Sequence, residues 1–232
     1  MSNSSILWLI PARGGSKGIP NKNIKDFCGI PLVNRAVKQA IDCASGNDSI
    51  FISTDSLKIK ETVEKTGVTV PFLRPDYLAT DTASTYDVIL HVLQELRKEG
   101  KEFEKIVLLQ PTSPLRTEND IRDALKLWNP DIDMVVSVCE AKTNPYFNAF
   151  EPDENGFLKI SKGEGNITRR QDAPKVWEYN GAIYVITTAS LLKGSFSSFK
   201  KIVPFIMPGI RSVDLDTPED WDIAELRFKN LN

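Results

Sequence analysis

Histidine and cysteine are both scarce in this sequence. His91 is the only histidine and falls inside a predicted helix, so no Ser-His-Asp or Cys-His arrangement can be assembled, which disfavours covalent hydrolase chemistry. The three cysteines, Cys28, Cys43 and Cys139, are odd in number and far apart. This spacing gives neither a disulfide framework nor a CxxC metal site, and it predicts a reducing, cytoplasmic environment.

The sequence also lacks an excess of charge of either sign and any long apolar run. Its 29 Lys and Arg residues against 31 Asp and Glu give a net charge of −2, which argues against a nucleic-acid partner because such binding needs a basic face. No stretch reaches the ~18 apolar residues of a membrane span, so we expect no membrane partner. With 232 residues, 41% of them hydrophobic, the chain is expected to form a single domain over residues 1–232.

Apolar, β-branched runs alternate with amphipathic stretches through the first 140 residues. This alternation predicts an α/β fold of three layers, with helices on both faces of a Rossmann-like, mainly parallel sheet. The strands are expected at residues 6–10, 49–53, 68–72, 106–109, 134–138 and 182–186. The helices are expected at residues 31–44, 57–66, 84–99 and 118–128.

The pattern breaks over residues 140–176, which are rich in proline and glycine and too long for a plain loop in a compact domain. A floppy surface excursion is one interpretation. However, the segment and its end carry much apolar surface, in Tyr146, Phe147, Phe150, Phe157 and Trp177. We therefore predict that this segment is an insertion that packs on a second subunit.

Residues 10–23 read IPARGGSKGIPNKN and directly follow the first predicted strand. Glycines let backbone N–H groups approach anionic oxygens, and three cations, Arg13, Lys17 and Lys22, supply the opposing charge. The run is not a Walker A loop, because Lys17 precedes Gly18, and it is not the GxGxxG dinucleotide fingerprint, which carries no lysine. It predicts a polyphosphate site.

Polar residues follow several other predicted strands. They include Asp55 after the second strand, Gln110 in the run LLQPTSPLR after the fourth, and the acids of VDLDTPED near the C-terminus. Because ligands of open α/β sheets bind beyond the carboxyl ends of strands, we expect these loops to converge on one crevice.

Asp214 and Asp216 stand two apart in an extended stretch, which puts both carboxylates on one side of the backbone. Such a pair facing a triphosphate suits Mg²⁺, which keeps several waters and needs few protein ligands. The alternative is that Asp216 caps the helix that follows. A further pair, Arg169 and Arg170, could clamp a carboxylate or simply form a solvated face.

Taken together, the runs IPARGGSKG, LRPDYLATDTAST, LLQPTSPLR, RRQD with NGAIY, and VDLDTPEDW resemble the acylneuraminate cytidylyltransferases in sequence and in order. That family uses CTP to activate a nonulosonic (sialic-type) acid, giving a CMP-sugar and pyrophosphate. The resemblance implies a nucleotidyltransferase fold, Mg²⁺ as cofactor, and CTP and a nonulosonic acid as partners. It also implies a homodimer in which residues 140–176 are a dimerisation insertion that caps the substrate site of the neighbouring subunit.

The resemblance also implies roles for individual residues. Catalysis is expected from Lys17, Arg13 and Lys22. Nucleotide binding is expected from Gly14, Gly15, Ser16, Asn23, Arg74, Thr85 and Gln110. Sugar binding is expected from Gln110, Arg169, Arg170 and Asn180, with Arg170 reaching the partner's site, and Mg²⁺ binding is expected from Asp214 and Asp216.

The sequence departs from some bacterial members at Glu178, where they carry a basic residue, and in the NPYFN run around Phe147, where they carry a lysine. The motifs thus leave several acids open: N-acetylneuraminic, legionaminic, pseudaminic, deaminated, or an eight-carbon ulosonic acid. A non-catalytic nucleotide-binding homologue is the other alternative, and the presence of Lys17, Gln110 and the acid pair argues against it.

Overall fold

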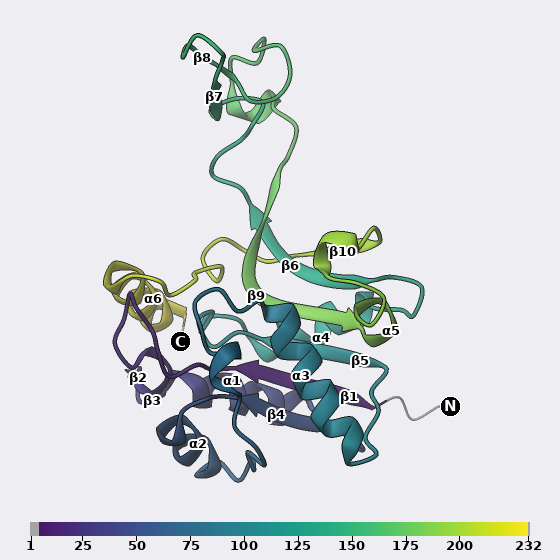
Figure 1. Cartoon of the computed structure of the whole chain (residues 1–232). Helices are drawn as coiled ribbons and strands as arrows, with labels where there is room; N and C mark the ends of the chain where they lie inside the picture. The colour runs from purple at the N-terminus through teal and green to yellow at the C-terminus, as the bar shows by residue number, and fades with distance from the viewer. Residues whose placement is uncertain (1–4, 232) are drawn as a thin grey trace.

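A six-stranded sheet forms the centre of the protein in this computed structural model, which describes residues 5–231 (Figure 1). The strand order is β10-β6-β9-β5-β1-β4. The bounds are β1 Ile6–Pro11, β4 Ser49–Ser53, β5 Lys105–Leu109, β6 Met134–Glu140, β9 Trp177–Thr187 and β10 Ile202–Ile206.

The sheet is mainly parallel, as predicted. Strand β1 pairs in parallel with both β4 and β5, and β10 pairs in parallel with β6. Strand β9 is the exception, because it runs antiparallel between β5 and β6. The carboxyl ends of β1, β4 and β5 therefore lie along one edge, where the loops after them meet.

Helices cover both faces of the sheet and make the predicted three layers. Alternate side chains of β1 show the division, because Trp8 and Ile10 join one core cluster while Leu7 and Leu9 join the other. The first cluster includes apolar side chains of α1 (Leu32–Cys43), α2 (Leu57–Glu64) and α4 (Glu118–Leu127), and the second those of α3 (Thr85–Lys98). Helix α5 (Thr188–Leu191) follows β9, and α6 (Pro218–Leu231) ends the described chain.

Local signals start several of these helices. Ser56 and Ser84 each accept a backbone hydrogen bond as N-caps of α2 and α3. Thr117 and Asp120 form a reciprocal capping box at α4. The shorter elements are η1 Lys22–Ile24, β2 Asp26–Phe27, β3 Ile30–Pro31, η2 Asp76–Leu78, η3 Arg170–Asp172 and η4 Phe196–Ser198.

The strand predicted at residues 68–72 is wrong. Val70 is fully buried, but its backbone N–H donates to Glu64 Oε1 at 3.2 Å instead of pairing with a strand. Phe72 packs against Phe51 of β4, which is the last strand at this edge of the sheet. The apolar character of the segment therefore reflects packing of a coil against the core and not a seventh strand.

Residues 141–176 leave the sheet at the end of β6 and return at the start of β9, and we call them the arm. Figure 1 shows the arm projecting from the body and carrying the small ribbon of β7 (Phe150–Pro152) and β8 (Leu158–Ile160). Phe157 and Leu158 are each 71% exposed. The predicted cover from a second subunit stays a prediction, and within this chain these side chains face solvent. Among residues 5–231, no helix is both long and apolar enough to cross a membrane.

Candidate active site

A cleft of about 370 Å³ opens at the carboxyl ends of β1 and β5. It brings together residues of four separate segments: the loop after β1, η1, the loop before α3, and the loop after β5, with Asp216 at its margin. The sequence-predicted residues that line it are Arg13, Ser16, Lys17, Lys22, Asn23, Arg74, Thr85, Gln110 and Asp216. The loops after β1 and β5 therefore converge with Asp216 as expected, whereas Asp55 and Asp214 do not line the cleft.

The loop after β1 is fastened to the body by its own polar groups. The backbone N–H of Gly14 donates to Asp55 Oδ1 at 2.8 Å, and Asn23 Nδ2 donates to the carbonyl of Arg13 at 2.9 Å. The N–H of Gly14 is thus used within the protein in this state, contrary to its expected role in meeting phosphate oxygens. Gly14 and Gly15 shape the loop without lining the cleft.

Gly18 fits against the backbone of the C-terminal acidic segment. A Cβ on Gly18 would lie 2.0 Å from the carbonyl oxygen of Asp216, so no larger residue fits without a backbone shift. Nearby, Lys22 Nζ donates to the carbonyl of Leu215 and lies 3.6 Å from Asp216 Oδ1. The phosphate loop and the acid pair are therefore held together by both close packing and charge.

Two cations of the loop share one carboxylate. Arg13 Nη1 lies 2.6 Å from Asp81 Oδ1, and Lys17 Nζ contacts Asp81 Oδ2. Hydrogen bonds from Lys17 and then Arg13 hold the pKa of Asp81 below its usual range. Sequence reasoning missed Asp81, although it lies within the run LRPDYLATDTAST, because nothing local indicates that it faces the loop 64 or more positions earlier.

Arg74 is a buried part of the cleft wall. Its Nη2 donates to the carbonyl of Ser53 at 2.6 Å and its Nε to Ser53 Oγ at 3.0 Å, while its side chain is largely withdrawn from water. Burial lowers the pKa of Arg74 to about 10, so the guanidinium stays charged at neutral pH. Arg74 is thus a buried cation that ties the loop before α3 to β4.

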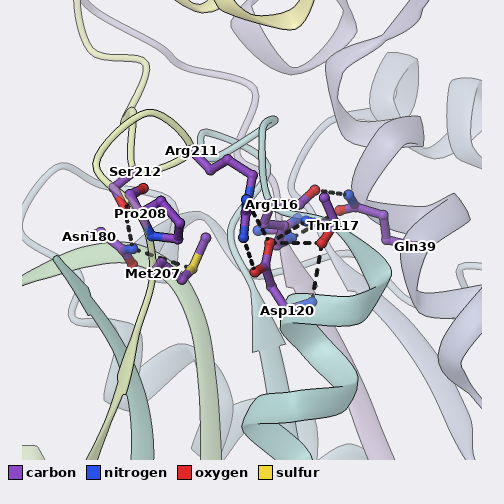
Figure 2. Close-up of polar contacts among 9 residues, drawn as sticks. All are labelled: Gln39, Arg116, Thr117, Asp120, Asn180, Met207, Pro208, Arg211 and Ser212. Carbon is purple, nitrogen blue, oxygen red and sulfur yellow. Dashed lines mark hydrogen bonds and ion pairs between the residues drawn. The ribbon is translucent and has the colours of Figure 1, made fainter. Parts of the chain in front are cut away.

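The loop that presents Gln110 is anchored by Arg116, whose contacts with Gln39 are drawn in Figure 2. Arg116 Nη1 donates to the carbonyl oxygens of Gln110 at 2.7 Å and Ala182 at 2.8 Å, and its Nε donates to Gln39 Oε1 at 2.9 Å. Gln39 in turn donates to the carbonyl of Arg116 at 2.6 Å. Because Arg116 is only 2% exposed, this network fixes the backbone of Gln110 from inside the protein.

The acid pair lies beside that loop. The N–H of Leu215 donates to the carbonyl of Thr112 at 2.9 Å, and Leu215 is buried between two exposed neighbours, Asp214 and Asp216, which therefore share one side. Desolvation by the surrounding protein, and the nearby charge of Asp216, raise the pKa of Asp214, against a hydrogen bond from Thr112 that lowers it. The described residues contain no group of three or more His, Cys, Asp or Glu side chains suited to a metal ion.

The capping role considered for Asp216 belongs to its neighbour. Thr217 Oγ1 accepts from the N–H of Asp220 at 3.2 Å, and Asp220 Oδ2 accepts from the N–H of Thr217 at 2.8 Å. This is a capping box at the start of α6 with Thr217 as the cap. The carboxylate of Asp216, whose side chain is 76% exposed, is left to face the cleft and Lys22.

The predicted sugar-binding residues of the later sequence do not reach the cleft of their own chain. Arg169 forms a bidentate pair with Asp172, at 2.7 and 3.2 Å, so its guanidinium is already paired within the arm. Arg170 donates to the carbonyl of Lys142 at 2.9 Å. Both arginines lie on the arm, which projects away from the body (Figure 1).

Asn180 is buried and fully engaged inside the protein (Figure 2). Its Oδ1 accepts from Ser137 Oγ at 2.6 Å, and its Nδ2 donates to Ser212 Oγ at 2.9 Å. Ser137 sits where the pairing of β6 with β9 shifts register, and its hydroxyl also accepts from the N–H of Ile183. Asn180 therefore joins these strands to the segment before the acid pair, and its assignment to substrate binding is not supported by this geometry.

A second cavity of about 440 Å³ adjoins the cleft and shares Thr85 and Gln110 with it. Its wall includes Tyr179, Tyr184 and Phe196, besides Ser84 and Met134. Burial, with Asp214 nearby, raises the pKa of Tyr184 to about 12, so its hydroxyl is a hydrogen-bond donor at neutral pH. Sequence reasoning missed these aromatics, since they come from β9 and from a segment near η4.

This arrangement can hold an anionic ligand at the cations and a second ligand against the aromatic wall. The N,N'-diacetyllegionaminic acid CMP-synthase of Legionella pneumophila is 31% identical over 228 residues, 98% of this chain and 97% of that protein. The N-acylneuraminate cytidylyltransferase of Streptococcus agalactiae serotype V is 33% identical over 93% of this chain, which spans 51% of that longer protein.

Among solved structures, CMP:2-keto-3-deoxy-manno-octonic acid synthetase complexed with CTP matches with a TM-score of 0.71 at 17% identity. That match covers 99% of this chain and all of that one. At this identity the match establishes the shared fold. The cytidylyltransferase family profile matches residues 7–174, which is most of the chain. The chain therefore belongs to the cytidylyltransferase family.

Proposed function

We propose that this cytidylyltransferase activates a nonulosonic acid with CTP and releases pyrophosphate. The observation that carries the proposal is the adjacency of the two cavities. The cation-lined cleft suits a nucleotide triphosphate, the aromatic cavity suits a sugar acid, and Thr85 and Gln110 stand where the two meet. The relatives that activate legionaminic and N-acylneuraminic acids support the same class of second substrate.

In this reaction the anomeric hydroxyl oxygen of the acid forms a bond to the α-phosphorus of CTP, its proton is released to water, and the bond to pyrophosphate breaks. Such phosphoryl chemistry depends mainly on positioning and charge neutralisation. Arg13, Lys17 and Lys22 would neutralise charge on the leaving pyrophosphate. Gln110, whose backbone carbonyl accepts a hydrogen bond from Arg116, would orient nucleotide or sugar hydroxyls through its side-chain amide.

Asp214 and Asp216 fit Mg²⁺, the cofactor we propose. Their charges face one side, and the repulsion that helps to raise the pKa of Asp214 is the kind that a bound cation relieves. Two carboxylates are enough because Mg²⁺ also takes waters and phosphate oxygens as ligands. When bound, the ion would supply positive charge next to the phosphates, on the same side as Lys22.

We further propose that the site is completed in a homodimer by the partner's arm. The exposed Phe150, Phe157 and Leu158 give the arm an apolar surface suited to a second copy of the chain. Arg170 donates a hydrogen bond to a carbonyl of its own arm, and its Cζ lies 6.0 Å from the ring centroid of Phe147. Its guanidinium would then meet the carboxylate of the partner's substrate. No arginine of the arm lines the cleft of its own subunit within the described residues.

Pyrophosphate release in the presence of CTP and Mg²⁺ tests the proposed reaction. The acids to compare are N-acetylneuraminic, legionaminic, pseudaminic, deaminated neuraminic and the eight-carbon ulosonic acid. One nine-carbon acid should give turnover, and Lys17→Ala should lower it at least ~10²-fold. Lys38→Ala, at an exposed lysine of α1, is the matched control and should leave turnover unchanged. Release with none of the acids, or an unaffected Lys17→Ala enzyme, would contradict the proposal.

Mixed dimers test the shared site. Subunits carrying Arg170→Ala and Lys17→Ala should each be inactive alone, and mixing them should restore part of the activity because the hybrid contains one complete site. A verified hybrid without recovery would show that Arg170 does not act across the interface. A fully active monomer at micromolar concentration would remove the dimer from the mechanism.

A further inference from the structure

Asp81 occupies the position in the cleft where an anionic ligand would meet the loop cations. Its two carboxylate oxygens are divided between them, with Oδ1 on Arg13 at 2.6 Å and Oδ2 on Lys17. No other hydrogen bond to this carboxylate is found among the described residues. A phosphate group presents its oxygens to two neighbouring cations in the same way.

We propose that Asp81 is an internal stand-in for the phosphates: it holds Arg13 and Lys17 in the empty cleft and must be displaced when the triphosphate binds. This inference rests on the proposed function of the cleft. It makes Asp81 a positioning residue for the reaction, with no contact to the reacting atoms required.

Charge explains why displacement has to occur. Arg13 and Lys17 are the cations closest to Asp81, and both of its oxygens are already used by them. Phosphate oxygens that bind these cations compete with Asp81 for the same donors, and a phosphate placed beside Asp81 would also be repelled by it. The carboxylate and the triphosphate therefore exclude one another.

The surroundings of Asp81 allow it to yield. The residue belongs to the short segment between η2 and α3, and its side chain is 42% exposed, while that of Lys17 is 82% exposed. Exposed ion pairs are individually weak, so the two contacts together should hinder a competing ligand between about twofold and about thirtyfold. A triphosphate can bind in spite of a loss of affinity of this size, because it has several charged oxygens that contact the cations.

The same competition assists turnover. The affinity of a ligand without phosphates does not depend on Asp81, because such a ligand leaves Asp81 paired with the cations. The affinities of CTP and pyrophosphate are lowered, because their phosphates must displace Asp81. After the CMP-sugar has formed, the return of Asp81 to Arg13 and Lys17 would favour the departure of pyrophosphate, because the cations are re-paired as it leaves. Asp81 is thus expected to raise the inhibition constant of pyrophosphate.

Asp81→Asn tests the inference, because it keeps the shape of the side chain and removes its charge. Isothermal titration of the full chain with CTP, without a sugar acid, and with inorganic pyrophosphate should show binding tighter by about twofold to about thirtyfold. Cytidine should bind equally to both proteins. Asp76→Asn, which removes a charge from an exposed residue of η2 nearby, is the matched control and should change none of the three affinities.

The outcomes separate this inference from the proposed function. If the wild-type protein binds neither CTP nor pyrophosphate, the function of the cleft is wrong and the inference falls with it. If the wild type binds both and a folded Asp81→Asn protein binds them no more tightly, or more weakly, Asp81 does not compete and only this inference is overturned. Thermal melts establish folding, and Asp81→Ser provides a second uncharged variant, expected to behave in the same way.

Discussion

Arg116 offers a sharp test of how the cleft is held from inside the protein. Its guanidinium is 2% exposed and donates to three acceptors on three different elements: Gln39 of α1, the carbonyl of Gln110 after β5, and that of Ala182 in β9. Burial lowers the pKa of Arg116 to about 9, which keeps the group charged at pH 7. A lysine would keep that buried charge but present a single ammonium group on a different stem.

The geometry sets the size of the effect. A single ammonium group cannot occupy the positions of both Nε and Nη1, so Arg116→Lys should leave at least one and up to two of the three acceptors without a partner. Each buried acceptor left unsatisfied costs about 1–3 kcal/mol, and the charge remains buried without compensation. We expect a loss of about 2–4 kcal/mol in the free energy of unfolding, which corresponds to a fall in Tm of roughly 4–16 °C for a domain of this size.

Urea unfolding and CTP titration measure the two consequences of Arg116→Lys. The KM for CTP should rise because the backbone of Gln110 loses its anchor, and this readout separates a positioning role from a purely structural one. Arg122→Lys is the matched control, since Arg122 is exposed on α4 and donates to one carbonyl, that of Asp42, at 2.8 Å. The reasoning would be refuted by an Arg116→Lys protein whose stability lies within about 0.5 kcal/mol of wild type.

Much of the sheet could be predicted from sequence because its strands are buried on both faces and its helices are amphipathic. The expected helix at residues 118–128 is found as Glu118–Leu127, and the expected strand at 49–53 as Ser49–Ser53. Strand β10 was not predicted, because Pro204 stands at its centre and a proline inside a run of apolar residues argues against a strand. Its place at the edge of the sheet is what allows the proline.

The cleft was only partly predictable for a similar reason. Lys17, Gln110 and Asp216 follow elements whose ends meet at one edge of the sheet, so a rule about parallel strands was enough to bring them together. The burial of Asn180 and the pairing of Asp81 with Arg13 depend on contacts between segments 32 to 68 residues apart. No local pattern encodes such contacts, and the roles of these residues in catalysis stay predictions.

Two further perturbations test the local geometry of the site and of the sheet edge. Gly18→Ala should weaken CTP binding and lower the free energy of unfolding by about 1–3 kcal/mol, because the added Cβ would lie 2.0 Å from the Asp216 carbonyl oxygen. Gly15→Ala is the control, since a Cβ at Gly15 would meet no atom within 4 Å. Equal behaviour of the two variants in CTP titration and thermal melting would contradict the argument. Asp133 accepts hydrogen bonds from the N–H groups of Lys200 and Lys201 and from Ser190 Oγ, and these contacts lower its pKa. The pKa of Asp133 in the folded protein lies below its unfolded value of ~3.9. Its negative charge therefore stabilises the folded state at pH values above ~3.9, and this stabilisation is lost as the pH falls through the lowered pKa. Asp133→Asn should therefore be less stable than wild type by roughly 1 kcal/mol at pH 7, and the gap should close on acidification; a gap in urea unfolding that stays constant down to the acid transition would show that the charge of Asp133 contributes nothing.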